Sequence, residues 1–281
     1  IPSLAPHLKK DMKTDTIDVQ KEMIPVFDLQ PSGEAGNKRW LTAYISEKLG
    51  VNREDILDYD LYLYNDDKAC RVGIKDAFLA SPRIDNLSSA AAMLDVLCTD
   101  ADINCVAISA FFDNEEIGSR SKQGADSNLF SSFVDKITKE LGKCGICTNS
   151  AGLMRNAFGI SLDVAHALHP NYQEKSDITN DVVLGGGIVL KSSAGQRYVT
   201  DSEAGAVIEQ LCRKYNIRLQ RQVNRSGMPG GQTLGPIMSS YLPVKSVDMG
   251  IPVLAMHSAS ELAAVEDYKE LVKLIGAFYK E

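Results

Sequence analysis

The sequence lacks the features of several broad classes of protein. Its longest apolar runs, such as Val106–Phe112, are far shorter than the ~20 residues that a membrane span requires. Basic residues are not in excess, because 30 Lys and Arg stand against 37 Asp and Glu and the net charge is −7. We therefore expect neither a nucleic-acid nor a membrane partner. No basic and apolar leader opens the chain, so we expect a cytoplasmic protein.

Cysteines are few and show little pairing. The six are Cys70, Cys98, Cys105, Cys144, Cys147 and Cys212. Four stand alone in apolar or helical contexts, which is typical of reduced thiols in a cytosolic protein. Cys144 and Cys147 form one C-x-x-C motif, which can indicate redox chemistry or half of a zinc site. The sequence has no second such motif and no thioredoxin-like aromatic beside this one, so we interpret the motif as incidental.

The composition is that of a globular protein, with 44% apolar and 24% charged residues over 281 positions. That length suits one large domain or two modest ones. The first 72 residues show weak periodicity, with a helix predicted over 37–50 and a strand over 58–64. From about Val72 onward, apolar patterns of helix and strand length alternate, which predicts a layered α/β fold. The predicted helices are 87–98, 128–141, 202–215 and 261–279, and the predicted strands are 105–112, 159–164, 182–190, 217–222 and 247–256.

Polar side chains stand where several predicted strands stop, and ligands of open α/β sheets bind at such edges. These side chains are Asp113–Glu116, Asp163 and His257, and Asp85 stands before the helix at Leu87. Each alone has a structural interpretation, as a solvated turn, a loop network, a hydrogen-bonded histidine or a helix N-cap. Together they are four segments at one sheet edge, and carboxylates so gathered repel one another unless a cation lies between them. The Asp, Glu and His mixture suits hard or borderline divalent metals.

The motifs that carry this chemistry resemble those of a known family. In chain order they are Ser81-Pro-Arg-Ile-Asp-Asn86, Asn114-Glu-Glu-Ile-Gly-Ser119, Asp163-Val-Ala-His-Ala-Leu-His-Pro-Asn171, Gly195-Gln-Arg-Tyr198, Pro229-Gly-Gly-Gln-Thr-Leu-Gly-Pro236 and Leu254-Ala-Met-His-Ser258. They resemble the aspartyl aminopeptidases, which include the vacuolar aminopeptidase I type, over nearly the whole chain. The resemblance implies an α/β/α sandwich around a mixed sheet, with part of an inserted β-rich dimerisation domain.

The resemblance also implies a zinc-dependent aminopeptidase that hydrolyses the N-terminal peptide bond of peptides. Two divalent metal ions, most simply zinc, would be bound by the chain. Asp85 would bridge both ions, Glu116 and His257 would ligate one, and Asp163 the other. Glu115 would be the general base that takes a proton from the attacking water. A homo-oligomer, in that family a dodecamer, is the implied assembly.

Further residues match by motif. The opening segment Ile1–Leu8 resembles one in which a histidine, here His7, reaches a neighbouring subunit's active site and stabilises the oxyanion. Lys191 matches a lysine that meets an acidic substrate side chain, and Gly231 and Met256 fall in substrate-binding motifs. Residues 1–72 would then be the C-terminal part of the dimerisation domain, and residues 73–281 the catalytic domain.

Two departures leave alternatives open. The family's His-x-Asp motif, which precedes the dimerisation insert, is absent, and the chain begins Ile-Pro-Ser-Leu without Met. We expect a catalytic domain that is incomplete on its N-terminal side. Gly227 stands where acid-specific relatives carry an acidic residue, which weakens the case for acidic substrates. A non-catalytic assembly subunit with an incomplete metal site is the alternative function. A phosphate loop over 227–235 is disfavoured because the G-x-G-x-x-G and Walker spacings are missing.

Overall fold

A computed structural model of the protein describes residues 1–8, 17–29, 40–99, 103, 105–145, 150–228 and 230–281. The chain forms two compact units, Ile1–Tyr64 and Asn65–Glu281. This division lies N-terminal to the predicted boundary at 72/73, because strand β1 (Cys70–Val72) pairs with β2 (Phe78–Ser81) in the second unit. The predicted C-x-x-C motif lies partly outside the described residues, since Cys147 falls in the gap at 146–149.

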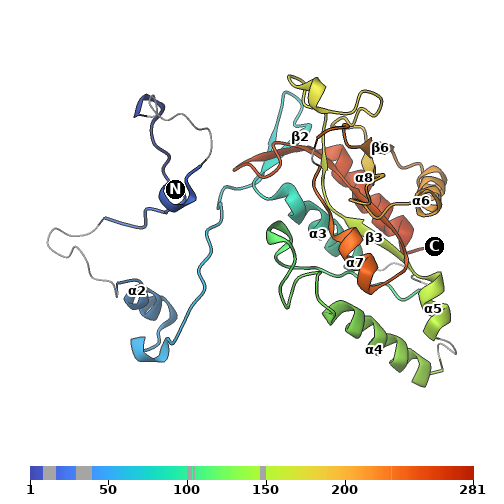
Figure 1. Ribbon diagram of the computed structural model, residues 1–281, viewed down its shortest axis with the longest axis horizontal. Coiled ribbons are helices and arrows are strands. Elements are labelled where there is room, and N and C mark those ends of the chain that lie inside the picture. Colours follow the sequence, from blue (N-terminus) through green and yellow to red (C-terminus); the bar gives the residue numbers. More distant parts are fainter. Residues whose placement is uncertain (9–16, 30–39, 100–102, 104, 146–149, 229) are drawn as a thin grey trace. The chain divides into compact units, whose positions relative to one another are not determined.

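The described part of the first unit contains short helical segments (Figure 1). They are η1 (Pro6–Leu8), α1 (Val19–Glu22), α2 (Trp40–Leu49) and η2 (Arg53–Asp55). The Phe27 ring packs on Trp40 and Tyr44 of α2, with centroids 4.7 and 5.2 Å apart. Helix α2 confirms the predicted helix from residue 40 onward, whereas its predicted residues 37–39 lie outside the described part.

The strand predicted over residues 58–64 is wrong. This segment is extended but belongs to neither sheet. Its large apolar side chains are exposed to solvent, for example Tyr62 at 83% and Tyr64 at 70%. Alternation of apolar side chains favours a strand only where a neighbouring strand accepts the backbone hydrogen bonds. Among the described residues of this unit, none has a buried side chain.

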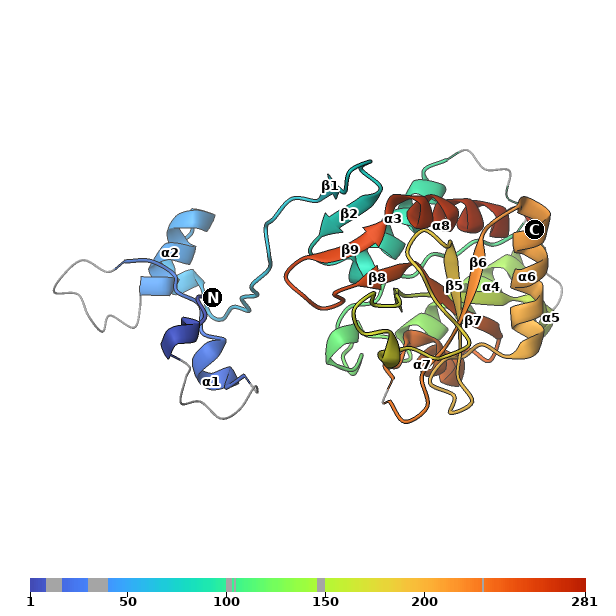
Figure 2. The same cartoon turned by 90° about the horizontal axis from the view of Figure 1, so that it is seen from above.

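The second unit is built on two mixed sheets. One has the strand order β1-β2-β9-β8-β4 and the other the order β3-β7-β5-β6. Beyond β1 and β2, the strands are β3 (Phe158–Leu162), β4 (Ala165–His166), β5 (Ile188–Ser192), β6 (Leu219–Val223), β7 (Lys245–Gly250), β8 (Pro252–Leu254) and β9 (Glu261–Ala264). Figure 2 shows β2, β9 and β8 side by side.

The two sheets share a continuous ladder. The N–H groups of Asp163, Ala165 and Ala167 donate in turn to the carbonyls of Met249, Ile251 and Val253 over 2.8–2.9 Å. The single buried strand predicted over 247–256 is therefore two strands, β7 and β8, that meet at the buried Ile251.

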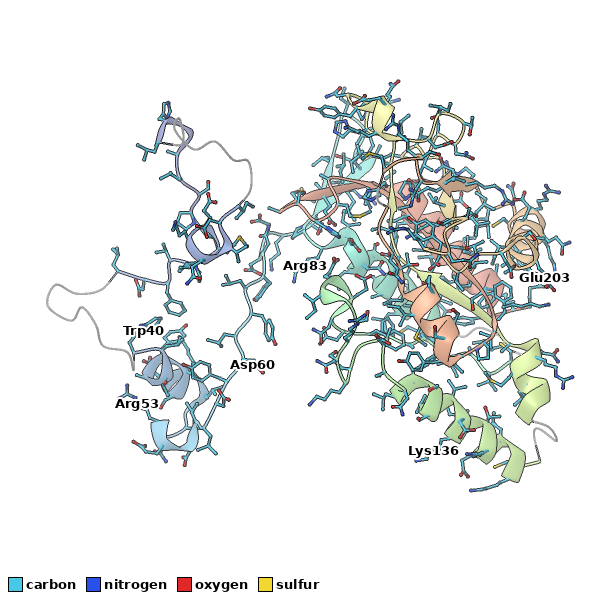
Figure 3. The ribbon with its side chains drawn as sticks, in the orientation of Figure 1. Trp40, Arg53, Asp60, Arg83, Lys136 and Glu203 are labelled. Atoms are coloured by element: carbon cyan, nitrogen blue, oxygen red, sulfur yellow. The ribbon has the colours of Figure 1, made fainter. Side chains whose placement is uncertain are left out.

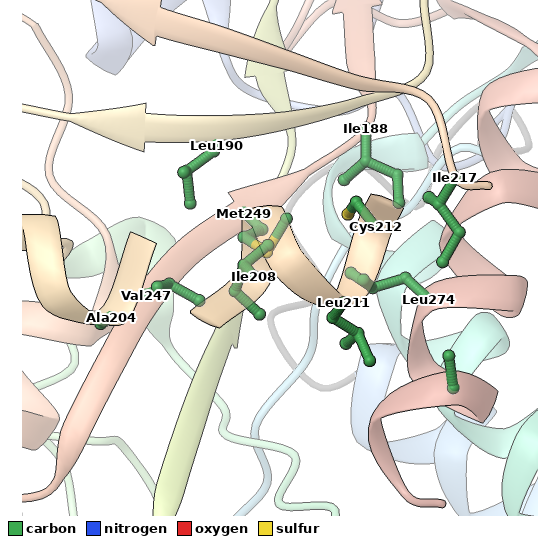
Figure 4. Close-up of a cluster of buried hydrophobic side chains, with 11 residues drawn as sticks. Ile188, Leu190, Ala204, Ile208, Leu211, Cys212, Ile217, Val247, Met249 and Leu274 are labelled. Carbon is green, nitrogen blue, oxygen red and sulfur yellow. The ribbon is translucent and has the colours of Figure 1, made fainter. Parts of the chain in front are cut away.

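Helices cover both faces of the β3-β7-β5-β6 sheet. Val247 and Met249 of β7 pack into a core with α6 (Ser202–Tyr215) and α8 (Val265–Phe278) (Figure 4). Asp248 between them points to the opposite face, as strand alternation requires. There it meets α7 (Leu234–Tyr241) so closely that a Cβ on Gly235 would lie 2.5 Å from Asp248 Oδ2. The predicted α/β/α layering is confirmed.

A second core lies between the other sheet and two helices. Helix α3 (Ile84–Leu97) packs against α8 and, with it, against β8 and β9 (Figure 2). Their buried side chains include Ile84, Val96, Val253 and Leu271. Strand β2 ends just before α3, which carries Asp85, and strand β8 ends just before His257. The sheet and α3 therefore position these two predicted ligands.

Three further predicted elements are wrong in whole or part. Residues 105–112 form no strand in the described structure, and Val106 and Phe111 are half exposed. The strand predicted at 182 begins only at Ile188, because Gly185 and Gly187 take positive φ in a turn. The helix predicted from 261 begins at Val265, because residues 261–264 pair with β2 and β8 as β9.

The other predicted helices and strands of this unit lie close to their predicted bounds. Helix α6 has the predicted bounds, and α3, β3 and β6 are displaced by a few residues. Helix α4 (Leu129–Lys143) matches the helix predicted over 128–141, and α5 (Ser150–Asn156) and the turns η3 (Glu115–Ile117) and η4 (Gln173–Lys175) complete the unit. Lys136 of α4 and Glu203 of α6 lie at the outer surface (Figure 3). Among the described residues, no helix combines the length and the apolar character of a membrane span.

Candidate metal centre

Three of the four predicted metal ligands come together in the second unit. His257 Nε2 lies 3.1 Å from Asp85 Oδ2 and 3.2 Å from Glu116 Oε2. Ligand atoms of the three side chains all lie within 4.8 Å of one another. Two carboxylates and one imidazole with this spacing form a set of three protein ligands, the number that a catalytic zinc ion uses while a further position stays open.

The predicted ligands lie in or next to tight turns, and not in the interior of helices or strands. Arg83, Asn114, Ala255 and His257 all have φ between 57 and 65°, a left-handed conformation that costs about 1–2 kcal/mol per non-glycine residue. Each lies in or directly before a segment that carries a ligand. Such conformations persist only where surrounding contacts hold them, and they gather at functional sites.

The fourth predicted ligand, Asp163, lies close by but outside this group of three. It follows β3, and its Oδ2 accepts a hydrogen bond from Lys191 Nζ over 3.3 Å. Lys191 is only 2% exposed and donates also to the Val164 carbonyl over 2.7 Å. The lysine predicted to meet the substrate thus contacts a predicted metal ligand.

The site gathers negative charge. Burial, followed by the charges of Asp163 and Glu116, raises the pKa of Asp85 to about 7. The same three causes raise the pKa of Glu115 to about 7, against the opposing charges of Lys191 and His257. Carboxylates that resist ionisation together form a site where a cation would be strongly favoured.

A cavity opens beside the predicted base. It has a volume of about 370 Å³ and is lined by Glu115, Gly118, Asp126, Gln232 and Thr233, among others. A second cavity of about 330 Å³ is lined by residues that include His166, His169, Arg225 and Ala255. Both are large enough for an amino-acid side chain, and each is lined by residues of the predicted motifs.

The remaining predicted residues lie in three places. Met256 is half-buried beside His257 and packs on the second core. Gly231 is exposed, next to Gly230, whose carbonyl accepts from Arg197 Nη1 over 2.7 Å. His7 lies in η1 of the first unit and is exposed. The roles of these residues stay predictions.

One further residue of the site, Glu261, cannot be identified from the sequence motifs. Its carboxylate is 2% exposed and accepts hydrogen bonds from the N–H groups of Asp85 and His257. Glu261 falls inside the predicted helix 261–279, where a single glutamate does not indicate a functional role. Its position four residues after His257 was the signal available.

These donors fit a divalent cation of the zinc type. The three clustered groups offer oxygen and imidazole nitrogen, which zinc binds at about 2.0–2.2 Å. A cation between Asp85 and Glu116 would also offset the repulsion that raises the Asp85 pKa. The layered sheet with this ligand set at its edge defines an α/β protein with a candidate metal-binding site.

The family follows from the sequence as a whole. Residues 1–279 match the model of the aminopeptidase I zinc metalloproteases (M18), and the chain belongs to this family. It is 38% identical over 280 residues to the "Probable M18 family aminopeptidase 2" of Clostridium acetobutylicum, a match that covers 99% of this chain and 64% of the relative. The chain thus spans less than two thirds of the length of such curated relatives.

Solved structures show the same fold. The crystal structure of prApe1 superposes with a TM-score of 0.85 at 28% identity, over 99% of this chain and 62% of that one. The dodecamer of mApe1 from S. cerevisiae superposes with a TM-score of 0.69 at 27% identity, over 85% and 54% of the two chains. The resemblance inferred from the motifs is confirmed.

Proposed function

We propose that the protein is a zinc-dependent aminopeptidase that removes N-terminal residues from peptides. The observation that carries this proposal is the convergence of Asp85, Glu116 and His257 beside Glu115, in a chain of the M18 family. Each of these residues falls on a motif of that family. The geometry supports a hydrolase whose chemistry is centred on this cluster.

The ligand assignment extends to two ions. Asp85 is the carboxylate shared by both, because it is the most deeply buried of the three clustered ligands and the charge of Asp163 acts on it. Glu116 and His257 complete the set for one ion. Asp163 is the proposed ligand of the other ion, and its carboxylate also accepts a hydrogen bond from Lys191.

Metal ions bound there would polarise the scissile carbonyl and lower the pKa of water toward ~7. The chain's own part is proton transfer by Glu115. Its pKa of about 7 in the metal-free protein is close to the value that suits a general base at neutral pH. Glu115 faces the 370 Å³ cavity, where a peptide could be held. It would take the proton of the attacking water and pass it to the departing amine.

Substrate recognition is proposed to involve Lys191, Gly231 and Met256. The Lys191 ammonium is buried, and two of its three N–H donors reach Asp163 and Val164; the third is the donor proposed to meet a substrate carboxylate. This favours acidic N-terminal residues. Gly227, at the position of an acidic residue in acid-specific relatives, argues for a broader preference.

We propose that residues 1–72 belong to a dimerisation domain and that residues 73–281 carry the catalysis. Apolar side chains of the first unit are widely exposed, for example Leu29 at 91% and Leu57 at 93%. Such surface indicates a protein partner. A homo-oligomer, and by analogy with the mApe1 dodecamer a dodecamer, would cover it and would let His7 act in a neighbouring subunit.

The five described cysteines are all free thiols, and four of them are exposed. Exposed free thiols are typical of a reducing compartment. This supports a cytoplasmic location.

The alternative is a non-catalytic assembly subunit with an incomplete metal site. The test uses the full-length protein, freed of metal by a chelator and then supplied with Zn²⁺. We expect zinc-dependent release of N-terminal residues from peptides, and its loss in Glu115→Gln. Glu266→Gln, an exposed glutamate paired with Lys269, is the control and should leave activity unchanged. Zinc binding without hydrolysis would favour the assembly subunit instead.

A further inference from the structure

Glu261 forms a bridge between two segments of the candidate metal centre. Its Oε2 accepts from the Asp85 N–H over 2.8 Å, and its Oε1 accepts from the His257 N–H over 2.7 Å. The residue is 2% exposed. A buried carboxylate is costly unless its oxygens are hydrogen-bonded, and here each oxygen holds the backbone of a different predicted ligand.

The sheet order explains why this residue can reach both segments. Strand β9, which Glu261 begins, lies between β2 and β8 in the sheet. Glu261 is the cross-strand partner of Ser81, at the end of β2, and the next residue, Leu262, pairs with Leu254 at the end of β8. The chain leaves β2 toward Asp85 and leaves β8 toward His257. The first side chain of the central strand therefore stands between the two departing segments.

The backbone at His257 needs such support. Its φ of 65° is in the left-handed region, as is that of Ala255, and such residues are stable only where neighbouring groups hold them. The hydrogen bond to Glu261 supplies a fixed acceptor for the His257 N–H. It sets where the imidazole can lie relative to Asp85.

We infer that Glu261 is a positioning residue, which holds Asp85 and His257 at the separation that a shared metal ion requires. This inference rests on the proposed function, because it assumes that the two residues bind metal. Partners of this kind typically change metal affinity 10–100-fold when they are replaced. Glu261 itself need not touch the ion.

The chain offers a matched control in Asp267. This carboxylate is also buried and also accepts from two backbone N–H groups, those of Gly185 and Gly187, over 2.7 and 2.8 Å. Neither partner is a predicted ligand. Loss of a doubly hydrogen-bonded buried carboxylate should therefore destabilise the fold equally in both variants, whereas only a change at Glu261 should alter the metal.

The test titrates Co²⁺ into the metal-free full-length protein and into Glu261→Gln and Asp267→Asn. We expect Glu261→Gln to weaken Co²⁺ binding about 10–100-fold and to shift the visible absorption bands. Asp267→Asn should lower the unfolding temperature but keep the affinity and the bands of the unchanged protein. Unchanged affinity and bands in Glu261→Gln, or equal changes in both variants, would overturn the inference.

A second measurement does not depend on the variants. In the unchanged metal-free protein, the amide hydrogens of Asp85 and His257 should exchange with solvent more slowly than those of neighbouring exposed turns. Fast exchange at both would show that the bridge does not exist. If the protein binds Co²⁺ but hydrolyses no peptide, the proposed function fails and the comparison of affinities still decides the role of Glu261. Absence of Co²⁺ binding in the unchanged protein would overturn both.

Discussion

The buried ammonium of Lys191 pairs with the partly exposed carboxylate of Asp163, with 3.3 Å between Nζ and Oδ2. The Lys191 ammonium also lies 5.5 Å from the centre of the Tyr198 ring. It joins β5 to the segment that follows β3, on the sheet face opposite α6. Lys191, which is proposed to meet the substrate, therefore also contributes contacts to the folded structure. Replacing Lys191 should have one effect on stability and a separate effect on substrate choice.

The first effect is on stability. Lys191→Met leaves the Asp163 carboxylate without its ammonium partner, and we expect a loss of unfolding free energy on the order of 2 kcal/mol in the metal-free protein. This is less than for a fully buried pair, because the Asp163 side chain is 23% exposed. Chemical denaturation of chelator-treated protein measures it. Lys214→Met, which removes an exposed partner of Glu281, is the control and should cost much less, because solvent screens exposed ion pairs.

The second effect is on substrate choice. If Lys191 meets an acidic side chain, Lys191→Met should lower kcat/KM for peptides with N-terminal Asp or Glu by about tenfold or more, as the loss of a charged hydrogen bond implies. Peptides with N-terminal Leu should be affected less. Equal losses on all peptides would assign Lys191 to the support of Asp163 alone.

Much of the fold could be predicted because its signals are local. Helix α6 has the predicted bounds, with Asp201 accepting from the Ala204 N–H as a cap and Asn216 in the left-handed conformation at the end. Strand β9 could not be predicted in this way. Residues 261–264 continue the apolar pattern of α8, and only their pairing with β2 and β8 makes them a strand. Tertiary contacts override local propensity in such short segments.

The same limit applies to the site. Asp85, Glu116 and His257 could be named from the sequence, because each falls in a motif that resembles one of the family. Glu261 could not, because its role depends on where β9 lies between two other strands. The failure of the predicted strand at 105–112 did not affect Glu116, because the turn η3 places the residue without a strand before it.

Glu115 and His257 should respond differently to mutation. Glu115→Gln removes the proposed base but no proposed ligand, so the protein should keep its zinc and lose roughly 10²–10⁴ in kcat. His257→Ala removes a proposed ligand and should lower the metal content instead. Metal analysis of each purified variant beside its kcat checks the division. A Glu115→Gln protein with near-normal turnover would contradict it.

The stability of the metal-free protein should depend on pH through the same site. The pKa values of Asp85 and Glu115 are raised from 3.8 and 4.5 to about 7. At a pH between the unfolded and the folded pKa values, these two carboxyls are protonated in the folded protein but ionised in the unfolded chain. The part of the unfolding free energy that they contribute therefore falls as pH rises. Glu115→Gln cannot ionise and should be more stable than the unchanged protein at pH 8 but not at pH 4. Melting curves of both proteins between pH 4 and pH 8 measure this. If the two melting temperatures changed in parallel with pH, the interpretation would be wrong.

His7 is proposed to act on the active site of a neighbouring subunit. His7→Ala and Glu115→Gln should each be inactive as homo-oligomers, since each lacks one essential group. Hybrid oligomers would contain some sites with an intact His7 from one subunit and an intact Glu115 from the other. Mixed and reassembled subunits should therefore regain part of the activity. Native mass spectrometry can show that the assemblies are mixed, and no recovery in mixed assemblies would argue against action between subunits.

Asp163 and Glu116 are assigned to different ions, and this can be tested by stoichiometry. Asp163→Asn should leave the ion at Asp85, Glu116 and His257 in place, because these three form a complete set of protein ligands without it. The full-length variant should then bind one tight Zn²⁺ per chain where the unchanged protein binds two. Glu116→Gln should weaken the other ion, since only Asp85 and His257 would remain for it. Isothermal titration of the metal-free proteins measures both, and two tight ions in Asp163→Asn would show that another residue ligates the second metal.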